Sequence, residues 1–295
     1  SLSYRTSVRI IMDLRSIEKS SVIPDLHMHS IFSDGNYTPE QLAEMASENG
    51  VNLVSLTDHD EIAGNERMRK ACEQKGIAFV SGVEISTGYA NKEIHIVGLN
   101  IDTSCPELIK ALQETKVNRI ERAEEISKKL KEMGYPGALE GAMKFVTNPN
   151  LVSRIHFAKW LVDTKAASSI DSAFEKFIGS GRPGFVSLKA PTISQAVHLI
   201  KGARGIPVLA HPGRYGLKGW KLQALLDEFR NAGGEVIEVT TGSHSSKDNT
   251  MICQIAREQA FIASTGSDFH RLDTRCPIGK QGEIPSDLTP VWSLF

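Results

Sequence analysis

DLHMHSIFSDG, residues 25–35, is the segment from which the architecture of this chain can be worked out. It follows a short apolar run and carries His27 and His29 with one residue between them. Alternate residues of an extended segment project to the same side, so both imidazoles can reach one metal ion. Asp34 follows in a Ser-Asp-Gly turn. The segment therefore predicts a strand that ends in metal ligands.

Similar chemistry recurs at the ends of other short apolar runs, most of which are separated by amphipathic helices. Such alternation with short links predicts a parallel sheet with crossover helices, either a barrel or an open doubly wound sheet. The predicted strands are residues 21–27, 51–59, 77–86, 93–101, 206–211, 235–241 and 261–268. The predicted helices around them are residues 39–50, 65–76, 192–203, 221–233 and 248–260.

Histidine, aspartate and glutamate gather where these strands end. In an α/β barrel the carboxyl ends of the strands converge on one mouth, where the active site lies. One metal ion needs three or four protein ligands, so a larger set indicates two or three ions, with one carboxylate able to bridge two of them. The candidate ligands are His27, His29, Asp34, His59, Glu84, His95, His211, Asp268 and His270. Of these, Asp34, His59, Glu84, His211, Asp268 and His270 are also the candidate catalytic residues.

Residues 104–190 interrupt the alternation. A long helix is predicted over residues 106–133, further helical pieces over 151–163 and 169–179, and a strand only at 184–188. This stretch holds 14 Lys and Arg against 10 Asp and Glu, a charge of +4, while the rest of the chain is −5. We therefore expect residues 22–103 and 191–295 to form the barrel and residues 104–190 a helical insertion that caps the site. Residues 1–21 are an N-terminal extension, part of which can be an expression remnant.

The composition is that of an ordinary globular protein. The 295 residues are 40% hydrophobic and 23% charged, with a net charge of −1, which argues against a broad basic surface for long nucleic acid. No window reaches the roughly 18 apolar residues of a membrane span, and no signal-peptide pattern opens the chain. The four cysteines are scattered and predict reduced thiols. We expect a cytoplasmic protein.

The motifs taken in order resemble the PHP (polymerase and histidinol phosphatase) phosphoesterases. They are DLHMHSIFSDG, LTDHD, GVEIS, EIHIVGLNID, LAHPGRY and GSDFH, from about Pro24 to past His270. The longer runs EIHIVGLNID, PGALEGA and LAHPGRY are most similar to the bacterial branch of 3',5'-nucleoside bisphosphate phosphatases, also called RNase AM. The resemblance implies an α/β fold, a distorted (β/α)7 TIM-like barrel with a helical insertion domain.

The resemblance also implies a trinuclear metal centre. His27, His29, Glu84 and Asp268 would hold the first ion, and Glu84 would bridge to a second ion completed by His95 and His211. Asp34, His59 and His270 would hold the third. These would be two or three divalent ions. Imidazole and carboxylate ligands without thiolate suit manganese, iron and zinc alike, and of these we expect manganese.

The implied reaction is hydrolysis of the 3'-phosphate of nucleoside 3',5'-bisphosphates, such as pAp to AMP, by a hydroxide that bridges the metals. The same chemistry would trim short 5'-phosphorylated RNA in the 5'-to-3' direction. The second phosphate of such substrates needs a basic clamp, and the planar fork of arginine suits it. The candidate substrate contacts are Ser153, Arg154, His156, Arg182 and Arg214. We expect neither a membrane nor long duplex nucleic acid as a partner.

Three other functions remain open on sequence alone. The barrel motifs also suit a phosphatase for another small phosphomonoester, such as histidinol phosphate. A non-catalytic metal- or nucleotide-binding regulatory module is disfavoured by the complete ligand set. An amidohydrolase-type deaminase is disfavoured because no lysine ends a predicted strand.

A few further polar residues stand near these motifs. Asp58 and Asp60 are expected to orient the ligands or to bond within their loop. His198, inside a helix, is expected to be structural, and His244, after a strand, could approach the mouth.

Overall fold

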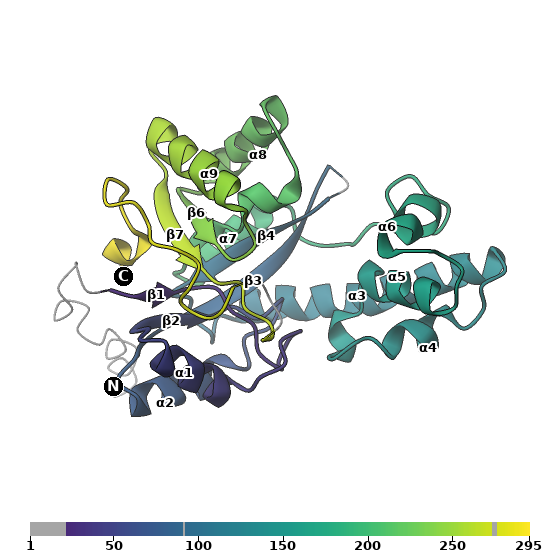
Figure 1. Cartoon of the computed structure of the whole chain (residues 1–295), viewed down its shortest axis with the longest axis horizontal. Coiled ribbons are helices and arrows are strands. Elements are labelled where there is room, and N and C mark those ends of the chain that lie inside the picture. The colour runs from purple at the N-terminus through teal and green to yellow at the C-terminus, as the bar shows by residue number, and fades with distance from the viewer. Residues whose placement is uncertain (1–21, 91, 273–275) are drawn as a thin grey trace.

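The fold is a seven-stranded sheet that nearly closes into a barrel, as expected from the sequence (Figure 1). The computed structural model describes residues 22–90, 92–272 and 276–295, so the predicted extension over residues 1–21 lies outside the described residues. The strands follow chain order, and the Leu26 amide donates to the Thr265 carbonyl at 3.2 Å, which brings the first strand beside the last. The strands are β1 (Pro24–Asp25), β2 (Leu53–Leu56), β3 (Ala78–Tyr89), β4 (Lys92–Leu99), β5 (Ile206–Leu209), β6 (Val236–Thr241) and β7 (Ile262–Gly266).

One strand departs from the predicted parallel pattern. β4 pairs antiparallel with both β3 and β5, because β3 turns directly into β4 without a crossover helix. All other neighbouring pairs are parallel. The reversal puts the first half of β4 at the mouth, where the other strands end. His95 therefore reaches the mouth from inside its strand.

Five helices surround the barrel: α1 (Pro39–Glu48), α2 (Asn65–Gln74), α7 (Ile193–Gly202), α8 (Trp220–Asn231) and α9 (Ser246–Gln259). α1, α7 and α9 each begin with a capping box, in which side chain and backbone satisfy each other's free polar groups. Among the described residues, no helix is both long and apolar enough to cross a membrane.

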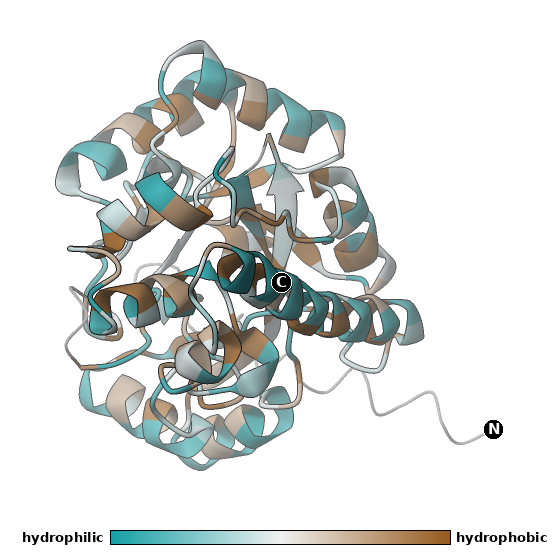
Figure 2. Cartoon of the chain, turned by 90° about the vertical axis from the view of Figure 1, so that its right-hand side faces the viewer, coloured by the Kyte–Doolittle hydropathy of each residue, from teal (hydrophilic) through white to brown (hydrophobic). Residues whose placement is uncertain are grey.

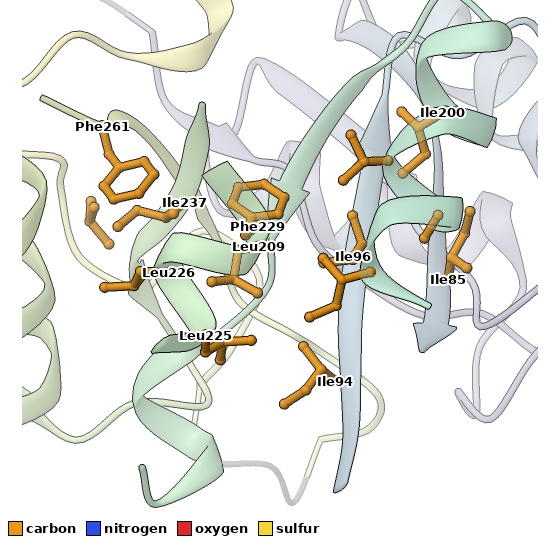
Figure 3. Packing of buried hydrophobic residues seen from close by; sticks show 14 of the residues in the cluster. Ile85, Ile94, Ile96, Ile200, Leu209, Leu225, Leu226, Phe229, Ile237 and Phe261 are labelled. Atoms are coloured by element: carbon orange, nitrogen blue, oxygen red, sulfur yellow. The ribbon is translucent and has the colours of Figure 1, made fainter. Parts of the chain in front are cut away.

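The hydrophobic core between the sheet and the outer helices fixes the strands that carry the site. Figure 3 shows Ile94 and Ile96 of β4 among Leu209 of β5, Leu225 of α8 and Ile237 of β6. Each is fully buried, which contributes on the order of 1.5–3 kcal/mol per side chain. Hydrophilic and hydrophobic residues alternate along the helices at the periphery in Figure 2, as expected for helices with one buried face.

A helical unit lies beyond the barrel mouth and is reached along α3 (Pro106–Glu132). At 27 residues this helix is about 40 Å long. Leu108 and Leu112 near its start pack in the barrel core, whereas Ile126 and Leu130 pack in a separate cluster. That cluster includes side chains of α4 (Ala138–Met143), α5 (Arg154–Asp163) and α6 (Ile170–Ala173). Dividing the chain into a barrel and an insertion at residues 104–190 remains our interpretation, since α3 contributes to both clusters.

The strand predicted over residues 184–188 is wrong. Gly184 lies in a turn and residues 185–188 belong to no sheet. Two backbone carbonyls of this segment accept hydrogen bonds from side chains of α3 instead. Lys129 Nζ donates to the Phe185 oxygen and Arg122 Nε donates to the Val186 oxygen, both at 2.9 Å. The β-branched and aromatic residues there therefore pack beneath a helix.

Short 3₁₀ and π-helical turns complete the described chain: η2 (Pro149–Leu151), η3 (Phe174–Ile178), η4 (Pro212–Tyr215) and η5 (Val291–Leu294).

Candidate metal centre and substrate cavity

Glu84 is the centre of the site. Its carboxylate is fully buried in β3, at the mouth end of the barrel. Oε2 lies 3.1 Å from His27 Nε2 and 3.1 Å from His29 Nε2, while Oε1 lies 3.1 Å from His211 Nε2. His59 Nδ1 and His95 Nδ1 are 3.2 and 2.9 Å away. One carboxylate thus meets five imidazoles from four different parts of the chain.

The first implied metal group is assembled completely. Asp268 Oδ1 lies 3.3 Å from His27 Nε2 and 3.2 Å from His29 Nε2. With Glu84, these residues offer four ligand atoms that all lie within 4.8 Å of one another. Asp268 has a φ of 53°, a costly conformation for a residue with a side chain, and such strain gathers at functional sites.

The other two groups overlap around His59. Asp34, His59 and His270 gather as implied, and His29 joins them. His59 also forms a group with Glu84 and His95, the pair implied for the second ion. His211 stands outside these groupings although it touches Glu84. The structure therefore brings all nine candidate ligands together, and how they divide among ions stays a prediction.

Buried atoms without partners indicate that this cluster suits cations. His27 Nε2, His29 Nε2, His59 Nδ1, His95 Nδ1 and Glu84 Oε2 have no hydrogen-bond partner in the described part of the chain. Leaving a buried polar atom unpaired costs about 1–3 kcal/mol, so five at one point require a compensating ligand. Imidazole nitrogens and carboxylate oxygens facing one centre fit divalent metal ions.

The charges in the cluster are strongly coupled. Burial alone would lower the pKa of His29, but the nearby carboxylates of Asp268 and Glu84 raise that pKa to about 10. For His95, likewise, the pKa rises to about 9 against the effect of burial, because Glu84 and Glu93 are near. Burial lowers the pKa of His59 to about 3 despite the same carboxylate. Without metal, protons therefore neutralise part of the acidic charge.

Glu238 of β6 is a supporting residue that the sequence analysis missed. Its carboxylate is 1% exposed, and Oε1 lies 2.6 Å from His27 Nδ1. An ionised carboxylate only accepts hydrogen bonds, so Nδ1 carries a proton and Nε2 is directed at the metal centre. Oε2 accepts from the His211 amide at 2.8 Å. A glutamate inside the apolar run EVIEVTT was the signal that could have found it.

Arg119 of α3 links the helical unit to the centre and was also missed. Its guanidinium is 4% exposed, and Nη2 lies 3.1 Å from Asp60 Oδ2 and 3.0 Å from Glu93 Oε1. The same nitrogen donates to Ser86 Oγ at 2.6 Å. Glu93 in turn lies 3.5 Å from His95 Nε2. Asp60 thus serves as an anchor for α3.

Three other polar residues near the motifs have structural surroundings. Asp58 accepts hydrogen bonds from Ser30 and Ser33, and so fixes the loop between His29 and Asp34. His244 Nε2 accepts from the Gly213 amide at 2.9 Å, which supports the turn after His211. His198 lies on α7, away from the cluster, beside a separate cavity between α3 and α7.

A cavity of about 690 Å³ opens over the cluster between the barrel and the helical unit. Asp34, His59, His95 and His211 line its barrel side. The predicted contacts Ser153, Arg154, His156 and Arg214 line it as well, and so do Arg119 and Tyr215. Arg119, Arg154 and Arg214 thus line the same cavity as the candidate metal ligands, and we call these three residues the basic wall.

The predicted contacts differ in how they are held. Arg154 lies between Phe174 and Phe185, with ring centres 5.6 and 5.2 Å from its guanidinium carbon. His156 Nδ1 accepts from the Ser153 amide at 3.0 Å and caps α5. Arg214 Nη1 lies 3.4 Å from Asp268 Oδ2. Arg182 is exposed and is not among the residues that line the cavity, so its phosphate contact stays a prediction.

Comparison with known proteins gives consistent matches. Residues 25–178 match the PHP domain family. The chain is 38% identical over 269 residues to a 3',5'-nucleoside bisphosphate phosphatase of Chromobacterium violaceum, covering 91% of this chain and 94% of that protein. It is 39% identical over 277 residues to the 5'-3' exoribonuclease Rnm of Escherichia coli, covering 93% and 94%.

The fold also matches a solved structure. An amidohydrolase from Chromobacterium violaceum, with bound sulfate and no metal, superposes with a TM-score of 0.81 at 37% identity. The match covers 92% of this chain and 95% of that chain.

Proposed function

This chain belongs to the PHP domain family, and on that premise we propose that it hydrolyses the 3'-phosphate of nucleoside 3',5'-bisphosphates and trims short 5'-phosphorylated RNA from its 5' end. It is a hydrolase of phosphoric esters, the class to which its relatives in Chromobacterium violaceum and Escherichia coli belong. The observation that carries the proposal is the cluster of nine ligand-type side chains at the floor of a cavity with a basic wall.

The cluster would hold two or three divalent ions, with manganese as our first choice and iron or zinc as alternatives. His27, His29, Glu84 and Asp268 would bind one ion, and Glu84 would be shared with His95 and His211. Asp34, His59 and His270 would bind another. When bound, such ions neutralise phosphate oxygens and make a nucleophilic hydroxide available at neutral pH. The five unpaired buried atoms support this assignment.

The bond that breaks is the same in both substrates. A water oxygen attacks phosphorus, the P–O3' bond breaks, and the 3' oxygen of the first nucleoside leaves with a proton. The bisphosphate yields a nucleoside 5'-monophosphate and phosphate. Short RNA yields the same monophosphate, and the remaining strand keeps a 5'-phosphate for the next round.

The basic wall would hold the 5'-phosphate that does not react. Arg154 is the best placed of our candidates, because two aromatic rings orient its guanidinium and no salt bridge to it is found among the described residues. Arg119 and Arg122 are nearer to Glu93, which neutralises part of their charge. A bidentate arginine contact adds both geometry and energy to phosphate binding.

The test is a substrate panel with the manganese-loaded protein: pAp, AMP, histidinol phosphate, and one oligoribonucleotide with either a 5'-phosphate or a 5'-hydroxyl. We expect turnover of pAp and of the 5'-phosphorylated strand, with little on the other three. Equal rates on both strands would contradict the binding of the 5'-phosphate by the basic wall. A preference for histidinol phosphate would place the enzyme in another substrate class.

Two arginine variants test which side chain binds the 5'-phosphate. Arg154→Ala should lower kcat/KM for pAp by about 10- to 100-fold, since a charge-assisted hydrogen bond is worth about 1.5–3 kcal/mol. Arg182→Ala tests the other predicted arginine contact, and we expect a smaller loss because that exposed arginine does not line the cavity. If both losses are equal, Arg154 is not the specific phosphate contact and Arg182 shares that role.

A further inference from the structure

We propose that residues 214–221 form a binding track for the RNA strand on the 3' side of the scissile bond, with Trp220 as its stacking platform. The inference rests on the proposed function, since only an oligonucleotide continues beyond the reacting phosphate. In that reaction the remaining strand stays attached to the phosphate and must leave through the barrel mouth. The mouth therefore needs a surface that receives it.

The segment starts inside the candidate active site. β5 runs toward the mouth, because His211 just beyond it contacts Glu84. Arg214 and Tyr215 of η4 line the substrate cavity. Trp220 begins α8 only five residues after Tyr215, so its Cα lies at most about 17 Å away. Two or three nucleotides of an extended strand could cover that distance.

The chemistry of the segment suits a single strand. Residues 211–224 contain no aspartate or glutamate but include Arg214, Lys218 and Lys221, all of them exposed. Arg214 approaches Asp268, whereas no salt bridge to either lysine is found in the described part of the chain. Cations interleaved with an aromatic ring are the usual elements of sequence-tolerant binding to single-stranded RNA.

Trp220 is presented to solvent in an unusual way. It is 76% exposed, more than any other large hydrophobic side chain among the described residues. Lys221 Nζ lies 5.7 Å from the centre of its ring. A base can stack on an indole face whatever the base is. The single ring and its neighbouring cations therefore point to one occupant, a nucleic acid strand that continues from the cavity.

The loop that presents the tryptophan is fixed to the core. Leu217 is buried in the main hydrophobic cluster, between Gly216 and Gly219. These glycines have φ values of 66° and 53°, which residues with side chains adopt only at a cost. The anchor and the two turns hold Trp220 in place before the strand arrives, and this lowers the entropy lost on binding.

The kinetic test compares wild type, Trp220→Ala and Trp220→Phe on pAp and on 5'-phosphorylated oligoribonucleotides of two to eight nucleotides. We expect the wild-type KM to fall with length until the strand reaches Trp220. Trp220→Ala should lower kcat/KM for the octamer relative to pAp by on the order of 10-fold, and Trp220→Phe should retain most of the preference. An unchanged ratio in Trp220→Ala overturns the inference.

A matched control comes from the opposite end of the barrel. Leu294 of η5 is also an exposed apolar side chain, 46% accessible, beyond the start of β7. Leu294→Ala should keep the wild-type ratio of octamer to pAp. If it lowers the ratio as much as Trp220→Ala does, the effect is not specific to the track and the inference fails.

A binding measurement separates this inference from the proposed function. Fluorescence anisotropy of a labelled 5'-phosphorylated octamer is recorded with the Asp268→Ala protein, with and without Trp220→Ala. Weaker binding in the double variant supports the track even if wild type never cleaves RNA, an outcome that would reject only the exoribonuclease function. Equal binding, with cleavage by wild type intact, rejects only the track.

Discussion

At the scale of single residues, the site depends on the residues that orient the candidate ligands as much as on the ligands themselves. His27 can direct Nε2 at the metal centre only because Glu238 accepts the Nδ1 proton at 2.6 Å. The same carboxylate fixes the His211 amide, at a residue whose φ is 30°. Glu238 therefore holds one candidate ligand ring and the strained backbone of another candidate ligand, and it belongs to none of the clusters that could bind a metal in the described part of the chain.

Glu238→Gln should weaken metal binding while leaving the fold intact. The amide cannot accept from both His27 and His211, so one of the two ligands loses its orientation. Loss of such supporting contacts commonly costs about 10- to 100-fold in metal affinity. The measurement is a manganese titration against a competing chelator. Glu235→Gln, an exposed change beside the same strand, is the control and should bind as wild type. Unchanged affinity in Glu238→Gln would contradict the role.

At the scale of elements, α3 is the connection between the two hydrophobic clusters. Its first turns pack in the barrel core and its later turns in the helical unit. Between them Arg119 bonds Asp60 on the loop after β2 and Glu93 on β4. The pair of carboxylates fixes the helix on the barrel at the level of the cavity, so the basic wall and the ligands keep one relative position.

Arg119→Met should destabilise the protein strongly, because it leaves Asp60 and Glu93 without their cation. Removing one partner of a buried ion pair costs about 3–5 kcal/mol in the free energy of unfolding. Urea denaturation of the metal-free protein measures it. Arg67→Met is the control, since Arg67 bonds Glu40 between α1 and α2 in an exposed pair. Equal losses in both variants would show that the buried network is not special.

At the scale of the whole molecule, the proposed metal centre joins strands that are far apart in sequence. β1, β3 and β7 supply His27, Glu84 and Asp268 or directly precede them, and β1 beside β7 closes the barrel. A ligand bound only by the folded state adds stability, about 2.7 kcal/mol when it is present at 100 times its Kd. Removal of the metal should therefore lower the free energy of unfolding of the closed barrel.

The stabilisation by manganese should increase with pH. In the metal-free protein the pKa of His29 is about 10 and that of His95 about 9, so both rings are protonated at neutral pH. Because these two histidines have a higher pKa in the folded than in the unfolded protein, their protonation stabilises the metal-free fold fully below about pH 6.5, the ordinary pKa of histidine. This contribution is lost as the pH rises toward 9–10. Metal must also displace these protons.

Thermal unfolding with and without manganese at pH 6.5, 7.5 and 8.5 checks this dependence. We expect the difference in Tm to grow from one pH to the next, together with a tightening apparent Kd. A difference in Tm that is constant across this range would contradict the proton competition.

How much could be predicted from sequence varies with the residue. The HxH pair and the strand-end motifs indicated a parallel α/β sheet with nine candidates near its carboxyl edge, because side-chain alternation and strand direction fix where such residues point. The resemblance to the PHP phosphoesterases then implied a barrel. His95 lies with the other candidate ligands although its strand runs the other way. The strand at residues 184–188 was predicted from local pattern alone, and hydrogen bonds from α3 gave that segment another environment.

Sequence by itself determined the α/β class, the ligand types and the presence of an interrupting helical region, since each follows from periodicity and residue chemistry within short windows. Periodicity left a barrel and an open sheet as alternatives, and only the resemblance to the PHP phosphoesterases implied the barrel. Tertiary structure decided the antiparallel β4, the anchoring of α3 by Arg119, and the choice of Glu238 as partner of His27. That last contact joins residues 211 positions apart. Hydrogen bonds and ion pairs act over a few ångströms, so their partners exist only after the chain has closed and brought distant strands together.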